Sequence, residues 1–84
     1  MKDWSCNVEF ALSGDNLARE AACHLTRAGV RAIPQKPGHY AFNSADSHED
    51  YLQALMGTVG KLDAILLPYG VTREIRAFQV VELP

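Results

Sequence analysis

The sequence predicts an α+β fold in which two helices cover one face of a mainly antiparallel sheet. Residues 3–12 alternate between apolar and polar side chains, a pattern typical of a strand with one buried face. Two later segments, residues 15–28 and 47–60, carry apolar side chains at helical spacing. Apolar runs bounded by proline and glycine follow both segments and indicate further strands.

Length, composition and charge restrict the class of protein. A chain of 84 residues forms one domain, residues 1–84, and an apolar fraction of 48% is typical of a globular protein. The net charge of −2 provides no general attraction to nucleic acid or to an anionic membrane. No apolar run reaches the ~20 residues of a spanning helix, and Met1-Lys2-Asp3 does not resemble a signal peptide. We therefore expect a cytoplasmic protein with no membrane partner and with reduced cysteines.

The first strand is expected to organise the fold. Its even positions are apolar, namely Trp4, Cys6, Val8, Phe10 and Leu12. A slip of one residue would move these side chains into water, so the pairing register is strongly specified. Right-handed crossovers through both helices would leave this strand in the centre of the sheet.

The next segment predicts a helix followed by a hairpin. Residues 15–28 carry an apolar stripe, and Gly29 is a suitable helix-ending glycine with Val30 as its apolar follower. Residues 30–33 and 39–43 are expected to pair as antiparallel strands, because only a short loop of proline and glycine separates them.

The second helix has a recognisable start and end. Ser47 followed by Asp50 resembles a capping box, and Gly57 and Gly60 are expected to weaken and then end the helix. Its predicted apolar stripe consists of Leu52, Leu55, Met56 and Val59.

Two strands are predicted after this helix. Residues 62–67 are apolar apart from Asp63 and stop at Pro68-Tyr69-Gly70. Residues 71–83 are read either as one strand with a bulge near Gln79 or as a bulged pair. The predicted order is β-α-β-β-α-β plus an extra C-terminal strand, which is a ferredoxin-like two-layer sandwich.

No group of residues in the sequence requires catalysis or a metal. Cys6 is predicted to face the core and Cys23 the solvent, so they are not expected to form a disulfide. Phosphate-binding, nucleophile-elbow and metal-site motifs are absent from the sequence. The polar run at residues 44–50 is explained by helix capping. We therefore expect no catalytic residue, no cofactor and no metal.

One segment resembles a known RNA-binding family. Gly38-His39-Tyr40-Ala41-Phe42, followed by a helix with Glu49-Asp50 and Ala54-Leu55, is similar to the RNP1 strand and second helix of an RNA recognition motif. In that family, aromatic side chains stack on splayed bases. The resemblance implies a platform of Tyr40 and Phe42, and Arg31 and Lys36 are the basic candidates nearby. Pro37 replaces the basic residue expected at the start of the motif.

Three classes of function follow from the sequence in addition to RNA binding. The first is a non-enzymatic protein-interaction or regulatory module, such as an inhibitor, adaptor or subunit, whose partner is another protein or a second copy. Its candidate contact residues are Leu67, Pro68 and Tyr69, which end an apolar run with an aromatic ring. The second is a small-ligand sensor acting as a dimer. The third is an enzyme using His39 or His48 with a nearby carboxylate.

Overall fold

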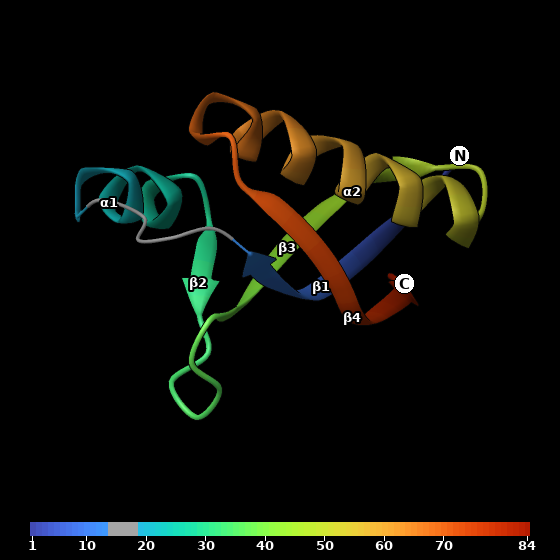
Figure 1. The fold of residues 1–84 in the computed structure, drawn as a ribbon. Helices are drawn as coiled ribbons and strands as arrows, with labels where there is room; N and C mark the ends of the chain where they lie inside the picture. The colour runs from blue at the N-terminus through green and yellow to red at the C-terminus, as the bar shows by residue number, and fades with distance from the viewer. Residues whose placement is uncertain (14–18) are drawn as a thin grey trace.

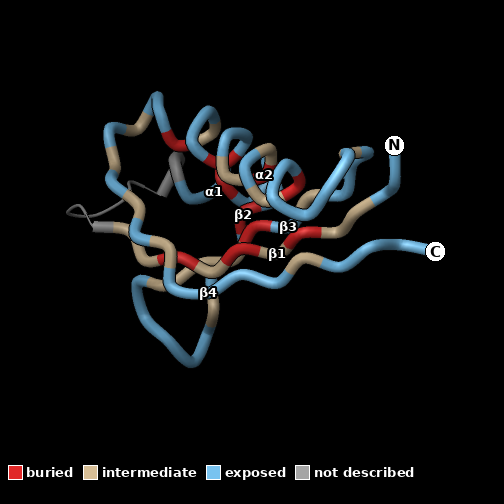
Figure 2. Tube along the Cα trace, turned by 90° about the vertical axis from the view of Figure 1, so that its right-hand side faces the viewer, coloured by how far each residue is buried: buried red, intermediate tan, exposed pale blue. Residues whose placement is uncertain are grey.

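The computed structural model describes residues 1–13 and 19–84, which form one antiparallel sheet of four strands with two helices against one face (Figures 1 and 2). The elements are β1 (Lys2–Ser13), α1 (Arg19–Arg27), β2 (Val30–Ala32), β3 (His39–His48), α2 (Tyr51–Leu66), the 3₁₀ helix η1 (Leu67–Tyr69) and β4 (Thr72–Glu82). This arrangement confirms the predicted α+β class and its two layers.

β1 lies in the middle of the sheet, as its sequence pattern predicts. The strand order is β2-β3-β1-β4, and β1 pairs antiparallel with both β3 and β4. The central position explains the strict alternation of β1, because its register is set by two neighbouring strands and by the helices above it.

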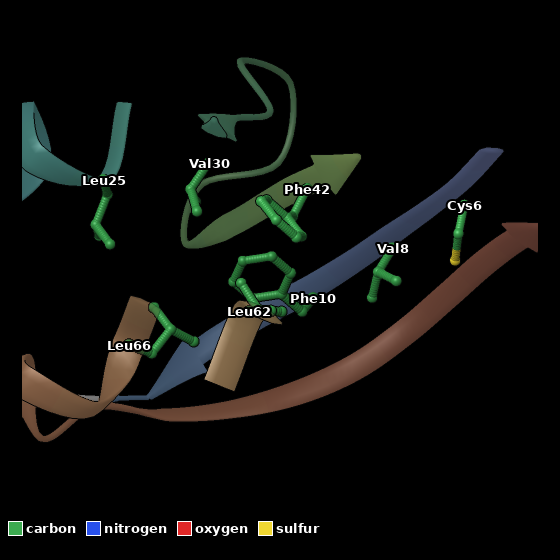
Figure 3. Close-up of a cluster of buried hydrophobic side chains, with 8 residues drawn as sticks. All are labelled: Cys6, Val8, Phe10, Leu25, Val30, Phe42, Leu62 and Leu66. Carbon is green, nitrogen blue, oxygen red and sulfur yellow. The ribbon is translucent and has the colours of Figure 1, made fainter. Parts of the chain in front are cut away.

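The core lies between the even face of β1 and the two helices. Cys6, Val8 and Phe10 are buried, and the ring of Phe10 stacks on Tyr40 of β3 with centroids 6.0 Å apart. Figure 3 shows Phe10 and Leu62 near the centre of the cluster, with Leu25 at one end. The remaining members of the buried apolar cluster are Val30, Phe42 and Leu66.

α1 ends where the sequence predicts. Gly29 has a φ of 97°, and its amide donates a hydrogen bond to the carbonyl oxygen of Thr26 at 3.1 Å. Val30, which follows this turn, is buried. The first four residues of the predicted helix, residues 15–18, lie outside the described part of the chain.

The second helix is longer than predicted, and the predicted strand at residues 62–67 is wrong. α2 continues through Gly57 and Gly60 to Leu66. Each glycine costs about 1 kcal/mol relative to alanine in a helix, whereas burying a leucine contributes about 1.5–3 kcal/mol. Leu62 and Leu66 are both buried beneath the helix, so their burial outweighs the cost of the glycines. The chain therefore has one strand after α2, and the predicted extra C-terminal strand does not exist.

The cap of α2 also differs from the prediction. The N-cap is Asp50, whose side chain accepts a hydrogen bond from the amide of Gln53 at 2.9 Å. The Gln53 side chain accepts in turn from the amide of Glu49 at 3.2 Å, which satisfies a second free amide. Ser47, the predicted capping residue, lies in β3 and donates to Asp3 at 2.6 Å. β3 thus runs five residues beyond its predicted end at residue 43.

β4 is a single strand with a bulge, which answers the question that the sequence left open. The β1–β4 register shifts between Glu9 and Phe10, where Arg76 is the additional residue. The bulge lies three positions before the predicted site at Gln79. It reverses the parity of β4, so Ile75 before it and Val80 after it both pack against the core.

The predicted break after the apolar run is confirmed. Pro68 lies within η1, and Gly70 adopts a φ of 63° while its amide donates to the carbonyl oxygen of Leu67 at 3.3 Å. The left-handed conformation is one that glycine adopts without strain, and it turns the chain from α2 into β4.

Candidate interaction surface

The three residues predicted as an interaction site do not share one surface. Leu67 is 80% exposed and Pro68 is also exposed. Tyr69 is half-buried against the core, and its hydroxyl lies 3.2 Å from His24 Nδ1 on α1. Tyr69 therefore connects η1 to α1, whereas Leu67 faces solvent.

The residues predicted for RNA contact are separated by the sheet. Tyr40 and Phe42 lie on the face covered by the helices, and Phe42 is only 6% exposed. Arg31 pairs with Ala41, so its side chain lies on the opposite face. Lys36 lies in the exposed loop after β2. A stacking platform needs exposed rings beside basic residues, and this arrangement does not provide one.

The C-terminal part of α2 contacts the start of the outer strand β4. Asp63 on α2 accepts hydrogen bonds from Nε and Nη2 of Arg73 on β4 at 2.9 and 3.1 Å. Met56 and Leu52 precede Asp63 by seven and eleven residues, so they lie on the same helix face. Both side chains are more than half exposed, at 65% for Met56 and 52% for Leu52. α2 therefore presents an apolar face to solvent on the β4 side of the molecule.

β4 has a free backbone edge. The amide of Leu83 donates to the carbonyl oxygen of Asp3 at 2.8 Å. Hydrogen-bonded positions alternate along an antiparallel pair, so the amide and carbonyl groups of Phe78, Val80 and Glu82 point away from β1. β4 is the last strand in the sheet order, so in the described part of the chain these groups have no neighbouring strand.

The outer half of β4 also carries exposed apolar side chains. Phe78 pairs with Val8 and Val80 pairs with Cys6, which places both side chains on the helix-covered face. Val8 is fully buried, but Phe78 is 54% exposed because it lies on the outermost strand. Figure 2 shows most of β4 as exposed along this edge. We call Leu52, Met56, Phe78 and Val80 the α2–β4 surface.

Charges of both signs border this surface. The hydrogen bond to Asp63 raises the pKa of the Arg73 guanidinium; partial burial lowers the pKa and the charge of Asp63 raises it further, both by smaller amounts. On the same strand, Arg76 pairs with Glu74 at 3.3 Å, and Glu82 pairs with Lys2 of β1 at 3.3 Å. These pairs are largely exposed, so each contributes little to stability.

The sequence pattern predicts Leu52 and Met56 in the apolar stripe of the second helix, but both lie outside its buried face. The buried positions of α2 recur every four residues, at Ala54, Thr58, Leu62 and Leu66. A helix that stopped at Gly60 would have a single apolar stripe. The four-residue spacing of the buried residues continues to Leu62 and Leu66. This continuation is the sequence signal that could have shown that Leu52 and Met56 lie on a different side of the helix.

The three histidines contact different parts of the molecule. His24 contacts the Tyr69 hydroxyl, and His39 Nδ1 lies 3.2 Å from the carbonyl oxygen of Pro37. The His48 ring lies against Gly57 of α2. Among the side chains that the structure describes, none of these rings forms a hydrogen bond or ion pair with a carboxylate.

Two shallow hollows lie along the sheet. One, of about 340 Å³, is lined by Asp3, Ala45, Asp46, Ser47 and Leu83. The other, of about 210 Å³, lies at the β4 edge and is lined by Asn7, Glu9, Ala77, Phe78 and Gln79. Within the described residues, no group of three or more histidine, cysteine or acidic side chains could hold a metal ion.

Comparison with known proteins adds no assignment. Searches against models of protein families, against curated proteins and against solved structures found no match. Among the helices of residues 1–13 and 19–84, none is long and apolar enough to cross a membrane.

Proposed function

We propose that this protein is a non-enzymatic protein-interaction module, acting as an inhibitor, adaptor or subunit through its α2–β4 surface. The observation that carries this proposal is the exposure of Phe78 on the free edge of β4, together with the exposure of Leu52 and Met56 on α2, each more than half accessible. A long free strand edge and exposed large apolar side chains are both features that proteins normally cover.

The two features complement each other as a binding site. The outward amide and carbonyl groups of β4 can form a backbone ladder with an added strand, which provides affinity. The side chains of Phe78 and Met56 then select partners whose apolar groups fit beside that ladder. The histidines are not engaged with carboxylates among the described side chains, so the geometry favours binding over acid–base catalysis.

We also infer a ferredoxin-like, split βαβ arrangement for the fold. Three observations support it: the strand order read as β4-β1-β3-β2, antiparallel neighbours throughout, and one helix after each of β1 and β3. We further propose a cytoplasmic location, supported by the free thiols of Cys6 and the exposed Cys23.

A small-ligand sensor is the second candidate function. It is favoured by the hollow at the β4 edge, which combines the polar side chains of Asn7, Glu9 and Gln79. Its volume of about 210 Å³ is below the ~300–1,000 Å³ of typical ligand pockets, so an added partner strand would have to deepen it.

The proposed surface can be tested by site-specific crosslinking. Phe78 is replaced with the photoreactive residue benzoylphenylalanine, and the protein is irradiated in a concentrated extract of its native cells. The matched control carries the same residue at Gln35, which is exposed in the loop after β2 at the other edge of the sheet. We expect adducts of discrete mass from position 78 and none from position 35.

A Met56→Lys variant of the Phe78-labelled protein completes this test. It places a charge on the apolar face of α2 and should abolish the adducts without changing the fold, since Met56 is exposed. Equal labelling from positions 78 and 35, or adducts that persist unchanged in the Met56→Lys background, would refute the proposed surface.

A further inference from the structure

We propose that the partner of the α2–β4 surface is an extended segment of a different protein, with a lysine or arginine side chain that pairs with Glu9. This inference rests on the proposed function, because it names the chemistry of the segment that adds to β4. The cationic group enters the hollow of about 210 Å³ at the β4 edge. By strand alternation, the side chains of Asn7, Glu9, Ala77 and Gln79 that line this hollow lie on the open face of the sheet, opposite the helices.

Glu9 is the acidic residue of the hollow, and it has no counter-ion among the described residues. It is half-buried on the central strand, where its neighbours in the pairing register are Ala41 of β3 and Ala77 of β4. Asp63 and Glu74 each pair with an arginine, whereas in the described part of the chain no ion pair or hydrogen bond involves the Glu9 carboxylate. The carboxylate is therefore available to a group that approaches over Ala77.

The arginines that share the open face with Glu9 do not neutralise it. Arg76, the bulge residue of β4, pairs with Glu74 at 3.3 Å. Arg31 lies two strands away from Glu9, on the far side of Ala41, and the two side chains form no ion pair. The position of a counter-ion is thus open on the β4 side, where a partner strand adds.

The rest of the lining also favours a cation. Asn7 and Gln79 pair with each other across β1 and β4, and each side-chain amide has a carbonyl oxygen that accepts hydrogen bonds. Lysine and arginine side chains carry several N–H donors and no acceptor, so they match a carboxylate flanked by amide oxygens. The hollow is smaller than the ~300–1,000 Å³ of pockets for whole ligands. Its size therefore suits a single side chain that a partner supplies.

The backbone of β4 places such a side chain at the hollow. The outward groups of Phe78 and Val80 bond an added strand, and the residues opposite them share the helix-covered face. The residues opposite Ala77 and Gln79 then have their side chains on the open face, beside the hollow. An added strand lies about 4.8 Å beyond β4 and roughly 10 Å from β1. A lysine or arginine side chain can cross this gap with its apolar stem along the Ala77 methyl group.

The added strand also makes the site selective for charge. It forms the outer wall of the hollow and excludes water from Glu9. A neutral side chain there leaves the carboxylate without water or a counter-ion, which is costly, and an acidic side chain adds repulsion. A second copy of β4 does not supply the cation, because beyond its bulge it presents Ala77, Gln79 and Val81 on the open face. The partner is therefore a different chain, in which apolar residues that face Phe78 alternate with at least one basic residue.

Synthetic peptides test the charge preference on the purified protein. The probe is a short fluorescent peptide that alternates threonine and valine, with lysine in place of the central threonine. Its amides on one edge are methylated, so that it cannot pair with itself. Two matched peptides carry glutamine or glutamate in place of the lysine. In fluorescence anisotropy, the lysine peptide should bind at least about fivefold more tightly than the glutamine peptide, and the glutamate peptide should bind most weakly.

Charge reversal tests whether Glu9 is the contact. Glu9→Lys should reverse the order, so that the glutamate peptide binds more tightly than the lysine peptide. Glu9→Gln should make the lysine and glutamine peptides bind equally. Glu49→Lys makes the same charge change at an exposed acidic residue that also lacks a counter-ion in the described chain, and it should keep the parent order. Thermal unfolding verifies the fold of each variant.

Three outcomes of the peptide titrations overturn the proposal. The first is equal binding of the three peptides to the parent protein. The second is an order of binding that Glu9→Lys leaves unchanged. The third is no binding of the lysine peptide at about 1 mM, a concentration at which even weak association is detected.

The adducts from position 78 test the same chemistry on the native partner. Mass spectrometry of the adduct should place a lysine or arginine at an odd spacing from the crosslinked residue, within about three positions. Adding Glu9→Gln to the Phe78-labelled protein should reduce the adduct yield at least about threefold. A crosslinked segment without a basic residue, or an adduct between two copies of this chain, overturns the proposal.

The failure of this inference differs from the failure of the proposed function. If position 78 crosslinks to a segment without a basic residue, and Glu9→Gln leaves the yield unchanged, the α2–β4 surface stands and the pairing with Glu9 is refuted. If position 78 gives no specific adduct and the peptides do not bind, both are refuted.

Discussion

Phe10 and Phe78 lie on the same face of the sheet but in opposite environments. Phe10 is fully buried on the central strand and stacks on Tyr40, whereas Phe78 is half exposed on the outermost strand. The same residue type therefore contributes to folding at one position and is available for binding at the other.

Replacing each phenylalanine with alanine separates these roles. Phe10→Ala should lower the free energy of unfolding by about 3–5 kcal/mol, the range for a large aromatic removed from a core. Phe78→Ala should change it by less than about 1 kcal/mol. Urea unfolding followed by circular dichroism measures both values. Similar losses for the two variants would contradict the difference in burial.

The two cysteines also differ in burial, as the sequence predicts. Cys6 is buried in the core and Cys23 is exposed on α1. In the native protein, a maleimide reagent should modify Cys23 within minutes and leave Cys6 unmodified until the protein unfolds. Mass spectrometry of tryptic peptides identifies the modified residue, and labelling in denaturant is the control. Modification of both thiols at equal native rates would show that Cys6 is accessible.

At the scale of the element, α2 contains two glycines in different surroundings. A Cβ added at Gly57 would lie 2.9 Å from Cε1 of His48, whereas one added at Gly60 has nothing within 4 Å. Gly57 therefore permits the close approach of β3 to the helix, and Gly60 has no comparable role.

Alanine at these two positions should have different effects. Gly60→Ala should raise the free energy of unfolding by about 0.5–1 kcal/mol, because alanine is the better helix former. Gly57→Ala should gain less or lose stability, because the His48 ring must move. Chemical denaturation measures both changes. Adding His48→Ala to Gly57→Ala removes the obstructing ring and should recover the helical gain. Equal stabilisation by both single substitutions would contradict the contact.

At the scale of the whole molecule, Tyr69 joins α1 to the rest of the structure. Its ring packs against the core, and its hydroxyl contacts His24. Figure 1 shows α1 beside β2, apart from the longer α2. Tyr69 was an interaction candidate in the sequence, and its position instead favours a role in holding α1 in place.

Two substitutions at Tyr69 test this role. Tyr69→Ala should lower the free energy of unfolding by about 1.5–2.5 kcal/mol, roughly half the loss for a fully buried ring, and should speed amide hydrogen exchange in α1. Tyr69→Phe should have a smaller effect, because only an exposed hydrogen bond is lost. Leu67→Ala, at an exposed neighbour, is the control. Weakened self-association of Tyr69→Ala, with stability unchanged, would place η1 in the interface.

The sequence by itself determined the features that depend on local patterns. The alternation of β1 defined its buried face, because its apolar even side chains had to avoid water. Its central position was predicted from right-handed crossovers through both helices. Gly29 and Gly70 ended their segments as predicted, because each adopts a positive φ that other residues rarely adopt. The exposure of Cys23 followed from its angular position on α1, which lies away from the apolar stripe of that helix.

Only the tertiary structure decided the length of α2 and the location of the candidate surface. Gly57 and Gly60 oppose a helix locally, and the burial of Leu62 and Leu66 against the sheet overcomes them. The local pattern predicted a bulge near Gln79, and the pairing with β1 places it at Arg76, where it reverses the parity of β4. Whether a strand has a free edge depends on which strands pair across the whole chain. The exposure of Phe78 and Met56 therefore followed from long-range packing.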